Sequence, residues 1–142
     1  MPLKLQFLYN LILIYLYIQG EHTSSVESLL NIDCNWAAPL LWRSEFRNVL
    51  ALYMRKKVIS FQQALDLIEQ AERLMIENEY QPSSAIVLSL VNASNCSAYD
   101  CEFVSLAKQL DVPLITQDKK ILAEFPQYTS QLTQYIQDAS KY

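Results

Sequence analysis

Glycine and histidine are almost missing from this chain, and each absence excludes a class of site. The 142 residues include one Gly and one His. With Gly20 standing alone, the chain has no glycine-rich loop of the kind that cradles phosphates. So few glycines also argue against an all-β fold with many tight turns. We expect the single histidine, His22, to cap the helix that starts near Ser24 or to lie exposed beside it.

An excess of positive charge is also missing. The net charge is −4 and the pI is about 4.9, whereas a protein that simply coats nucleic acid is normally basic. Several basic residues cluster in one predicted helix, namely Arg43, Arg47, Arg55, Lys56 and Lys57. They form either an ordinary solvated helix face or, through Arg43 and Arg47, contacts to phosphates. The three cysteines have no metal-ligand spacing, and their odd number favours a reducing cytoplasm.

The chain also lacks an apolar run of membrane-spanning length. Such a span needs about 20 apolar residues, and the run at residues 7–18 is shorter and interrupted by Asn10. Three interpretations of this run stay open: a buried parallel strand leading into a helix, a secretory signal or anchor, or non-native sequence over residues 1–14. Its Ile, Leu and Tyr content favours the strand, and no small-residue cleavage site follows it. We expect no stable membrane association.

Apolar spacing and capping residues predict a single α/β domain over residues 1–142. Strands are predicted at 7–14, 35–38 and 112–116, with a turn or stub strand at 80–82. Helices are predicted at 25–31, 39–57 with Pro39 in the first turn, 60–78, 84–92, from 97 to the turn before 112, and 130–140. Strands that alternate with helices imply a short central parallel sheet with helices on both faces. Ligands of such sheets bind at the carboxyl ends of the strands.

Acidic side chains follow or begin three of these elements. Asp118 lies just past the strand at 112–116, Asp100 lies in the first turn of the helix before that strand, and Glu45 lies near the start of an earlier helix. Convergent carboxylates are the ligands that a hard cation such as Mg²⁺ needs. Each acid also has an ordinary interpretation: Asp100 as a helix-start acid, Asp118 as a turn acid, and Glu45 as a solvated residue.

Three segments carry a resemblance to a known family. They are Trp36-Ala-Ala-Pro39 leading into Glu45 and Asn48, Ala98-Tyr-Asp100 with Leu106-Ala107, and Pro113-Leu-Ile-Thr116 with Asp118. Their order and spacing resemble the PIN-domain nucleases, and within them the VapC-like ribonuclease toxins. The resemblance implies a PIN-like three-layer α/β fold whose Glu45, Asp100 and Asp118 are the metal-binding and catalytic acids, supported by Asn48 and Thr116. It also implies Mg²⁺ or Mn²⁺ as the cofactor, RNA as the substrate, a small antitoxin as a partner, and a homodimer.

The first strand departs from the family pattern. That pattern has an Asp at the end of the strand, near Leu8 or Tyr9 by position, but Gln6-Phe-Leu-Tyr-Asn10 contains no acid. Asn10 is the nearest polar residue, and a neutral amide brings the cation no charge. Either the site works with three acids, or the chain has lost activity, or its first residues are not the ancestral ones.

Three functions therefore stay open. The first is a metal-dependent ribonuclease with an incomplete acidic site, which we expect to bind its cation weakly and to cleave slowly or not at all. The second is an inactive PIN-fold module that binds an antitoxin or RNA, which the missing acid favours. The third, a secreted or membrane-attached small protein, depends only on the apolar run at residues 7–18.

Overall fold

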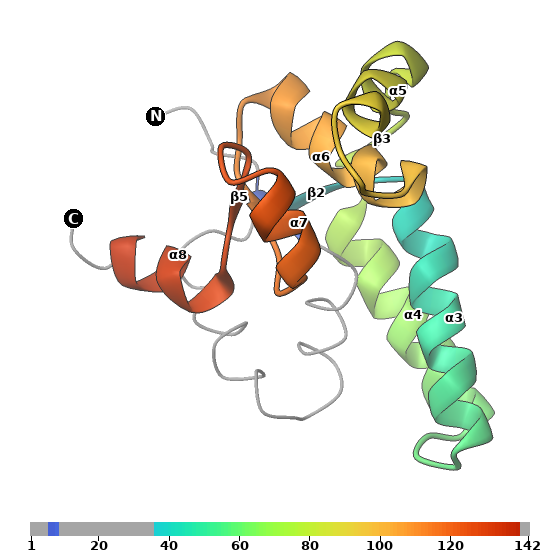
Figure 1. Ribbon diagram of the computed structural model, residues 1–142. Coiled ribbons are helices and arrows are strands. Elements are labelled where there is room, and N and C mark those ends of the chain that lie inside the picture. Colours follow the sequence, from blue (N-terminus) through green and yellow to red (C-terminus); the bar gives the residue numbers. More distant parts are fainter. Residues whose placement is uncertain (1–5, 9–35, 140–142) are drawn as a thin grey trace.

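The computed structural model describes residues 6–8 and 36–139 (Figure 1). The predicted helix at 25–31 lies outside the described residues, as do Asn10, His22 and Cys34. Most of the apolar run at residues 7–18 lies outside them too. Its three interpretations therefore stay open.

A five-stranded sheet forms the centre of the structure. Its strands are, in spatial order, β3 (Glu79–Tyr80), β2 (Trp36–Pro39), β1 (Gln6–Leu8), β4 (Leu114–Ile115) and β5 (Thr129–Ser130). Each neighbouring pair is parallel. The predicted α/β fold with a short central parallel sheet is confirmed. The first strand begins one residue earlier than predicted, and β5, only two residues long, is a strand that the sequence pattern did not predict.

Six described helices surround the sheet. They are α3 (Leu41–Arg55), α4 (Phe61–Met75), α5 (Ser84–Asn92), α6 (Ala98–Leu110), α7 (Lys119–Glu124) and α8 (Leu132–Ala139). Five of them match predicted helices, with shifts of a few residues at their ends. The capping box that predicts α4 is present, because the Ser60 hydroxyl accepts from the Gln63 N–H at 3.1 Å and the Gln63 side chain accepts from the Ser60 N–H at 2.8 Å.

Two helix boundaries need correction. Pro39 is the last residue of β2 and not part of the first helical turn, because α3 begins at Leu41. The N–H groups of Ala38 and Leu40 donate to carbonyls of the β3 segment, so the N–H that proline lacks is not needed for that pairing. The helix predicted to reach residue 78 ends at Met75. Glu77 adopts a left-handed φ of 69° that stops the helix before β3.

The core lies between the sheet and its helices. Trp36, Ala37, Leu114 and Ile115 are fully buried in the strands. They face fully buried side chains from helices, the largest of which are Trp42, Phe46, Phe103 and Met75. Helix α6 contacts β1, β2 and β4, and it packs most extensively against α5. Each large apolar side chain buried in this way contributes about 1.5–3 kcal/mol to folding.

Helices α3 and α4 form a helical hairpin. They contact each other, and both contact β2. Figure 1 shows them side by side, projecting from the rest of the molecule. No helix within residues 6–8 and 36–139 has both the length and the apolar character that crossing a membrane requires.

Candidate functional site

Asp118 is the N-cap residue of α7, a helix that the sequence pattern did not predict. Its Oδ1 accepts from the backbone N–H of Lys120 at 2.9 Å and of Ile121 at 3.0 Å. The Asp118 N–H donates to Oγ1 of Thr116 at 3.0 Å, and Thr116 is fully buried. Helix α7 has six residues, too few to show a periodic pattern. The signal that could have found it is Asp118 itself, an N-cap residue type before an apolar residue at position 121.

Asp100 lies in the first turn of α6 and is half-buried. Its backbone N–H donates to the Ser97 hydroxyl at 3.1 Å, so the predicted helix start at Ser97 is confirmed. The flanking thiols of Cys96 and Cys101 are buried and free. Burial raises the pKa of both thiols, and the negative charge of Asp100 raises each pKa further. The charge of Asp100 therefore lies near two buried thiols.

Glu45 is half-buried in the second turn of α3. Trp42 and Phe46, on either side of it in the sequence, are fully buried, and their rings meet edge to face with centroids 5.9 Å apart. These two anchors fix the rotation of α3 against the core and thereby the direction in which Glu45 projects. Asn48, three residues farther along the same helix, is exposed, and so is Arg47, two residues after Glu45.

Arg43 takes part in an ion-pair cluster that local sequence patterns did not reveal. Its Nε and Nη2 donate to the two carboxylate oxygens of Glu79 at 2.6 and 2.7 Å, and Nη1 lies 3.6 Å from Glu72. The indole N–H of Trp42 also donates to Glu79, at 2.9 Å. The Arg43 hydrogen bond holds the pKa of Glu79 below its ordinary value. The partners lie 36 and 37 residues apart in sequence, so no local signal could have found Glu79.

The sheet topology indicates where the three predicted acids lie relative to the carboxyl edge of the sheet. Parallel strands place their carboxyl ends at one edge, and Asp118 and Glu45 follow the ends of β4 and β2. Helix α6 ends just before β4 begins and crosses β1 and β2. Its 13 residues span roughly 20 Å, so its first turn, with Asp100, is directed toward the same carboxyl edge.

A metal centre that is already assembled is not seen in the described part of the chain. Within residues 6–8 and 36–139, no three side chains of His, Cys, Asp or Glu lie together so as to hold a metal ion. The donor chemistry of Glu45, Asp100 and Asp118 fits Mg²⁺ or Mn²⁺, because carboxylate oxygens are hard ligands. The convergence of Glu45, Asp100 and Asp118 on one cation stays a prediction. The roles of Asn48, Thr116, Arg43 and Arg47 also stay predictions. Of the two candidate positions for the family's first-strand acid, Leu8 is the last residue of β1 and Tyr9 lies outside the described residues.

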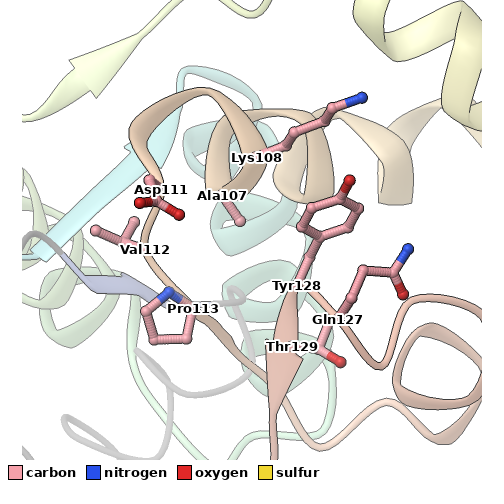
Figure 2. A pocket seen from close by; sticks show the side chains of 8 residues that line it. All are labelled: Ala107, Lys108, Asp111, Val112, Pro113, Gln127, Tyr128 and Thr129. Carbon is pink, nitrogen blue, oxygen red and sulfur yellow. The ribbon is translucent and has the colours of Figure 1, made fainter.

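Two pockets lie away from these acids. A pocket of about 260 Å³ opens where α6 ends and β4 and β5 begin, at the amino edge of the sheet. Figure 2 shows that the Lys108 ammonium points away from the Asp111 carboxylate at its rim. A second pocket, of about 270 Å³, is an apolar groove between α3 and α4 that includes Phe61, Leu65 and Met54. Neither is lined by Glu45, Asp100 or Asp118.

Comparison with known proteins identifies the fold and the family. The structure is similar to the crystal structure of PAE2754 from Pyrobaculum aerophilum, with a TM-score of 0.76, 14% sequence identity, and 98% of each chain covered. At this identity the likeness establishes the fold alone. No curated protein matches the sequence. Residues 12–126 match the PIN domain, and this match spans most of the chain. The chain therefore belongs to the PIN domain family.

Proposed function

We propose that this protein is a metal-dependent ribonuclease of the VapC toxin type with an incomplete acidic site. The observation that carries the proposal is the PIN domain match over residues 12–126, combined with three acids on the elements that lead to the carboxyl edge of the sheet. The PIN fold is a nuclease-type fold, and PIN domains generally use divalent metals. The proposed reaction is hydrolysis of an RNA phosphodiester bond, in which water attacks phosphorus and the bond to the leaving oxygen breaks.

The proposed cofactor, Mg²⁺ or Mn²⁺, supplies Lewis acidity toward the phosphate and lowers the pKa of bound water. Asp118 is suited to hold it because both cap bonds end on Oδ1, so Oδ2 can be directed to a cation without breaking the cap. Thr116 fixes the backbone of Asp118. Asp100 and Glu45 supply the two further negative charges. Asn48 is proposed to orient the bound water, and the exposed Arg47 to contact a phosphate.

Arg43 is less well suited than Arg47 to bind a phosphate. Two of its nitrogen atoms already donate to Glu79, and the carboxylate offsets its charge. A phosphate contact by Arg43 would therefore be made by the remaining N–H groups of the guanidinium while the ion pair stays in place. We propose Arg47 as the stronger of the two contacts for this reason.

The proposed assembly follows from the toxin interpretation. It comprises a homodimer and a small antitoxin that blocks the enzyme, acting in the cytoplasm on RNA. The support for it is the resemblance of the three acidic segments to VapC-like toxins. An inactive PIN-fold module that binds an antitoxin or RNA is the second candidate. The specific observation in its favour is the absence of an acid from Gln6 to Asn10.

A cleavage assay on unstructured RNA with Mn²⁺ tests the proposal. The variants are Asp118→Asn, the control Asp111→Asn, and Leu8→Asp and Tyr9→Asp, which each place an acid at one of the two candidate family positions. Asn replaces Asp at an N-cap with little loss of stability, so Asp118→Asn removes charge and keeps the fold. Asp111 is exposed at the other end of α6 in a left-handed conformation, with φ 54°, which Asn also accepts.

We expect slow Mn²⁺-dependent cleavage by the unaltered chain. Asp118→Asn should abolish this cleavage, Asp111→Asn should preserve it, and Leu8→Asp or Tyr9→Asp should accelerate it. Cleavage unaffected by Asp118→Asn would contradict the metal-site assignment. No cleavage by any variant, with RNA still bound, would favour the binding module.

A further inference from the structure

The first turn of α3 lacks the side-chain acceptors that usually bind the free backbone N–H groups at the start of a helix. Leu40 is the N-cap residue, its side chain makes no capping hydrogen bond, and no acid lies in the first turn. The first N–H groups of a helix have no partners within the helix and need acceptors from elsewhere. Here the neighbouring strand contributes, because the Leu40 N–H donates to the Tyr80 carbonyl at 3.0 Å. The start of α3 therefore depends on the β3 segment.

Glu79 of β3 makes the second connection. Its carboxylate accepts from Arg43 at 2.6 and 2.7 Å and from the indole of Trp42 at 2.9 Å, and both donors lie in the first turn of α3. The Glu79 side chain is 14% exposed, so water cannot readily replace these partners. An Arg–carboxylate pair with two parallel bonds fixes orientation as well as distance. The three side chains, which we call the Glu79 clamp, set both the position and the rotation of the first turn.

Glu45 lies three residues after Trp42 and two after Arg43, so its direction depends on this same turn. Resting on the metal site of the proposed function, we propose that Glu79 is a positioning residue that holds Glu45 toward the cation through Arg43 and Trp42. Glu79 itself binds neither metal nor RNA in this proposal. A small rotation of α3 would change the direction in which Glu45 projects, since the side chain extends from the helix surface.

Loss of the carboxylate charge would loosen the clamp without deleting a large side chain. Glu79→Gln keeps the shape but replaces one acceptor oxygen with a donor, so it cannot accept from both Trp42 and the two Arg43 nitrogens as the carboxylate does. Arg43→Lys keeps the charge but loses the paired geometry. A matched control is Glu69→Gln, which breaks the exposed pair of Glu69 with Arg73 on α4 and touches no residue of the clamp.

The test measures Mn²⁺ binding without RNA together with amide hydrogen exchange. We expect Glu79→Gln to weaken Mn²⁺ binding about tenfold, the lower end of the range for residues that orient metal ligands, and Arg43→Lys to weaken it several-fold. Amides at residues 41–45 should exchange faster in both variants, while global unfolding stays a rare event. Glu69→Gln should change neither. A merely structural role would reduce the fraction of protein that binds but would not shift the Mn²⁺ midpoint of the folded fraction.

The outcomes separate this inference from the proposed function. An Mn²⁺ midpoint that shifts in Asp118→Asn but not in Glu79→Gln would overturn the positioning role and leave the metal site standing. No Mn²⁺ binding by the unaltered chain would overturn both. Equal shifts in Glu79→Gln and Glu69→Gln would also overturn the inference, because a general loss of surface charge would then explain them.

Discussion

Replacing Asp118 by Ala and by Asn separates its two roles. The Asp118 carboxylate caps α7 through two backbone N–H groups, at 2.9 and 3.0 Å. Ala removes the acceptor, whereas Asn keeps an oxygen that can cap equally well and removes only the charge. We therefore expect Asp118→Ala to destabilise the fold, and Asp118→Asn to leave it nearly unchanged while both abolish metal-dependent activity.

The destabilisation expected for Asp118→Ala follows from the energy of an N-cap hydrogen bond. Loss of an N-cap side chain costs about 1 kcal/mol, within a range of roughly 0.5–2 kcal/mol. Ile121 is fully buried and keeps α7 attached to the core, so the loss is confined to the cap itself. One kcal/mol corresponds to a fall in Tm of about 3 °C for a chain of this size.

Urea unfolding followed by circular dichroism measures this difference. With a slope of about 2 kcal/mol per molar urea, Asp118→Ala should lower the midpoint by roughly 0.5 M with the slope unchanged. Asp118→Asn should lie within about 0.1–0.2 M of the unaltered chain. Equal destabilisation by Ala and Asn would refute the reasoning, since the loss would then come from charge and not from the cap.

Three further outcomes follow from the described contacts. Arg43 depresses the pKa of Glu79. The clamp therefore stabilises the fold above the ordinary carboxyl pKa, and this stabilisation is lost as the pH falls through the lower pKa of the folded state. Urea midpoints measured from pH 7 to pH 2 should fall more steeply in the unaltered chain than in Glu79→Gln. Phe103→Ala removes a fully buried ring from α6 and should lower the free energy of unfolding by about 3–5 kcal/mol. A decrease under about 1 kcal/mol in the same urea assay would contradict the described core. Burial raises the pKa of the Cys96 and Cys101 thiols. Iodoacetamide should therefore alkylate both thiols slowly at pH 8 until urea exposes them. Rapid labelling of the folded chain, measured by mass spectrometry, would show that the thiols are not buried.

The sequence pattern predicted those elements that have strong local signals. The helices from Phe61 and Ala98 were predicted because Ser60 and Ser97 both cap their helices as expected. The central strands predicted at 35–38 and 112–116 are observed at 36–39 and 114–115. They were predicted because apolar residues buried on both sides leave a continuous run. Their pairing in one parallel sheet followed from the alternation with helices.

The misses have separate physical causes. Strand β5 and helix α7 have two and six residues, so neither is long enough to show a period. Pro39 was assigned to a helix because proline suits a first turn, but the strand end tolerates it since its neighbours supply the donors. The Glu79 clamp depends on contacts across the fold, which no local pattern contains.

The candidate site was predictable in composition more than in geometry. Glu45, Asp100 and Asp118 were proposed from their places at element ends and from the resemblance of their segments to PIN nucleases, and their metal role stays a prediction. Asp118 also has the cap role that an Asp at a helix start commonly takes. Their separation depends on how α3 and α6 rotate against the sheet, and such rotations are set by core side chains such as Trp42 and Phe103 rather than by the acids themselves.

Titration of Mn²⁺ into the unaltered chain and into Asp118→Asn, followed by electron paramagnetic resonance of the free ion, tests the central claim most directly. The account predicts weak binding by the unaltered chain, at least tenfold weaker binding by Asp118→Asn, and no change in the control Asp111→Asn. Equal Mn²⁺ affinity in all three proteins would contradict the assignment of Asp118 to a metal site.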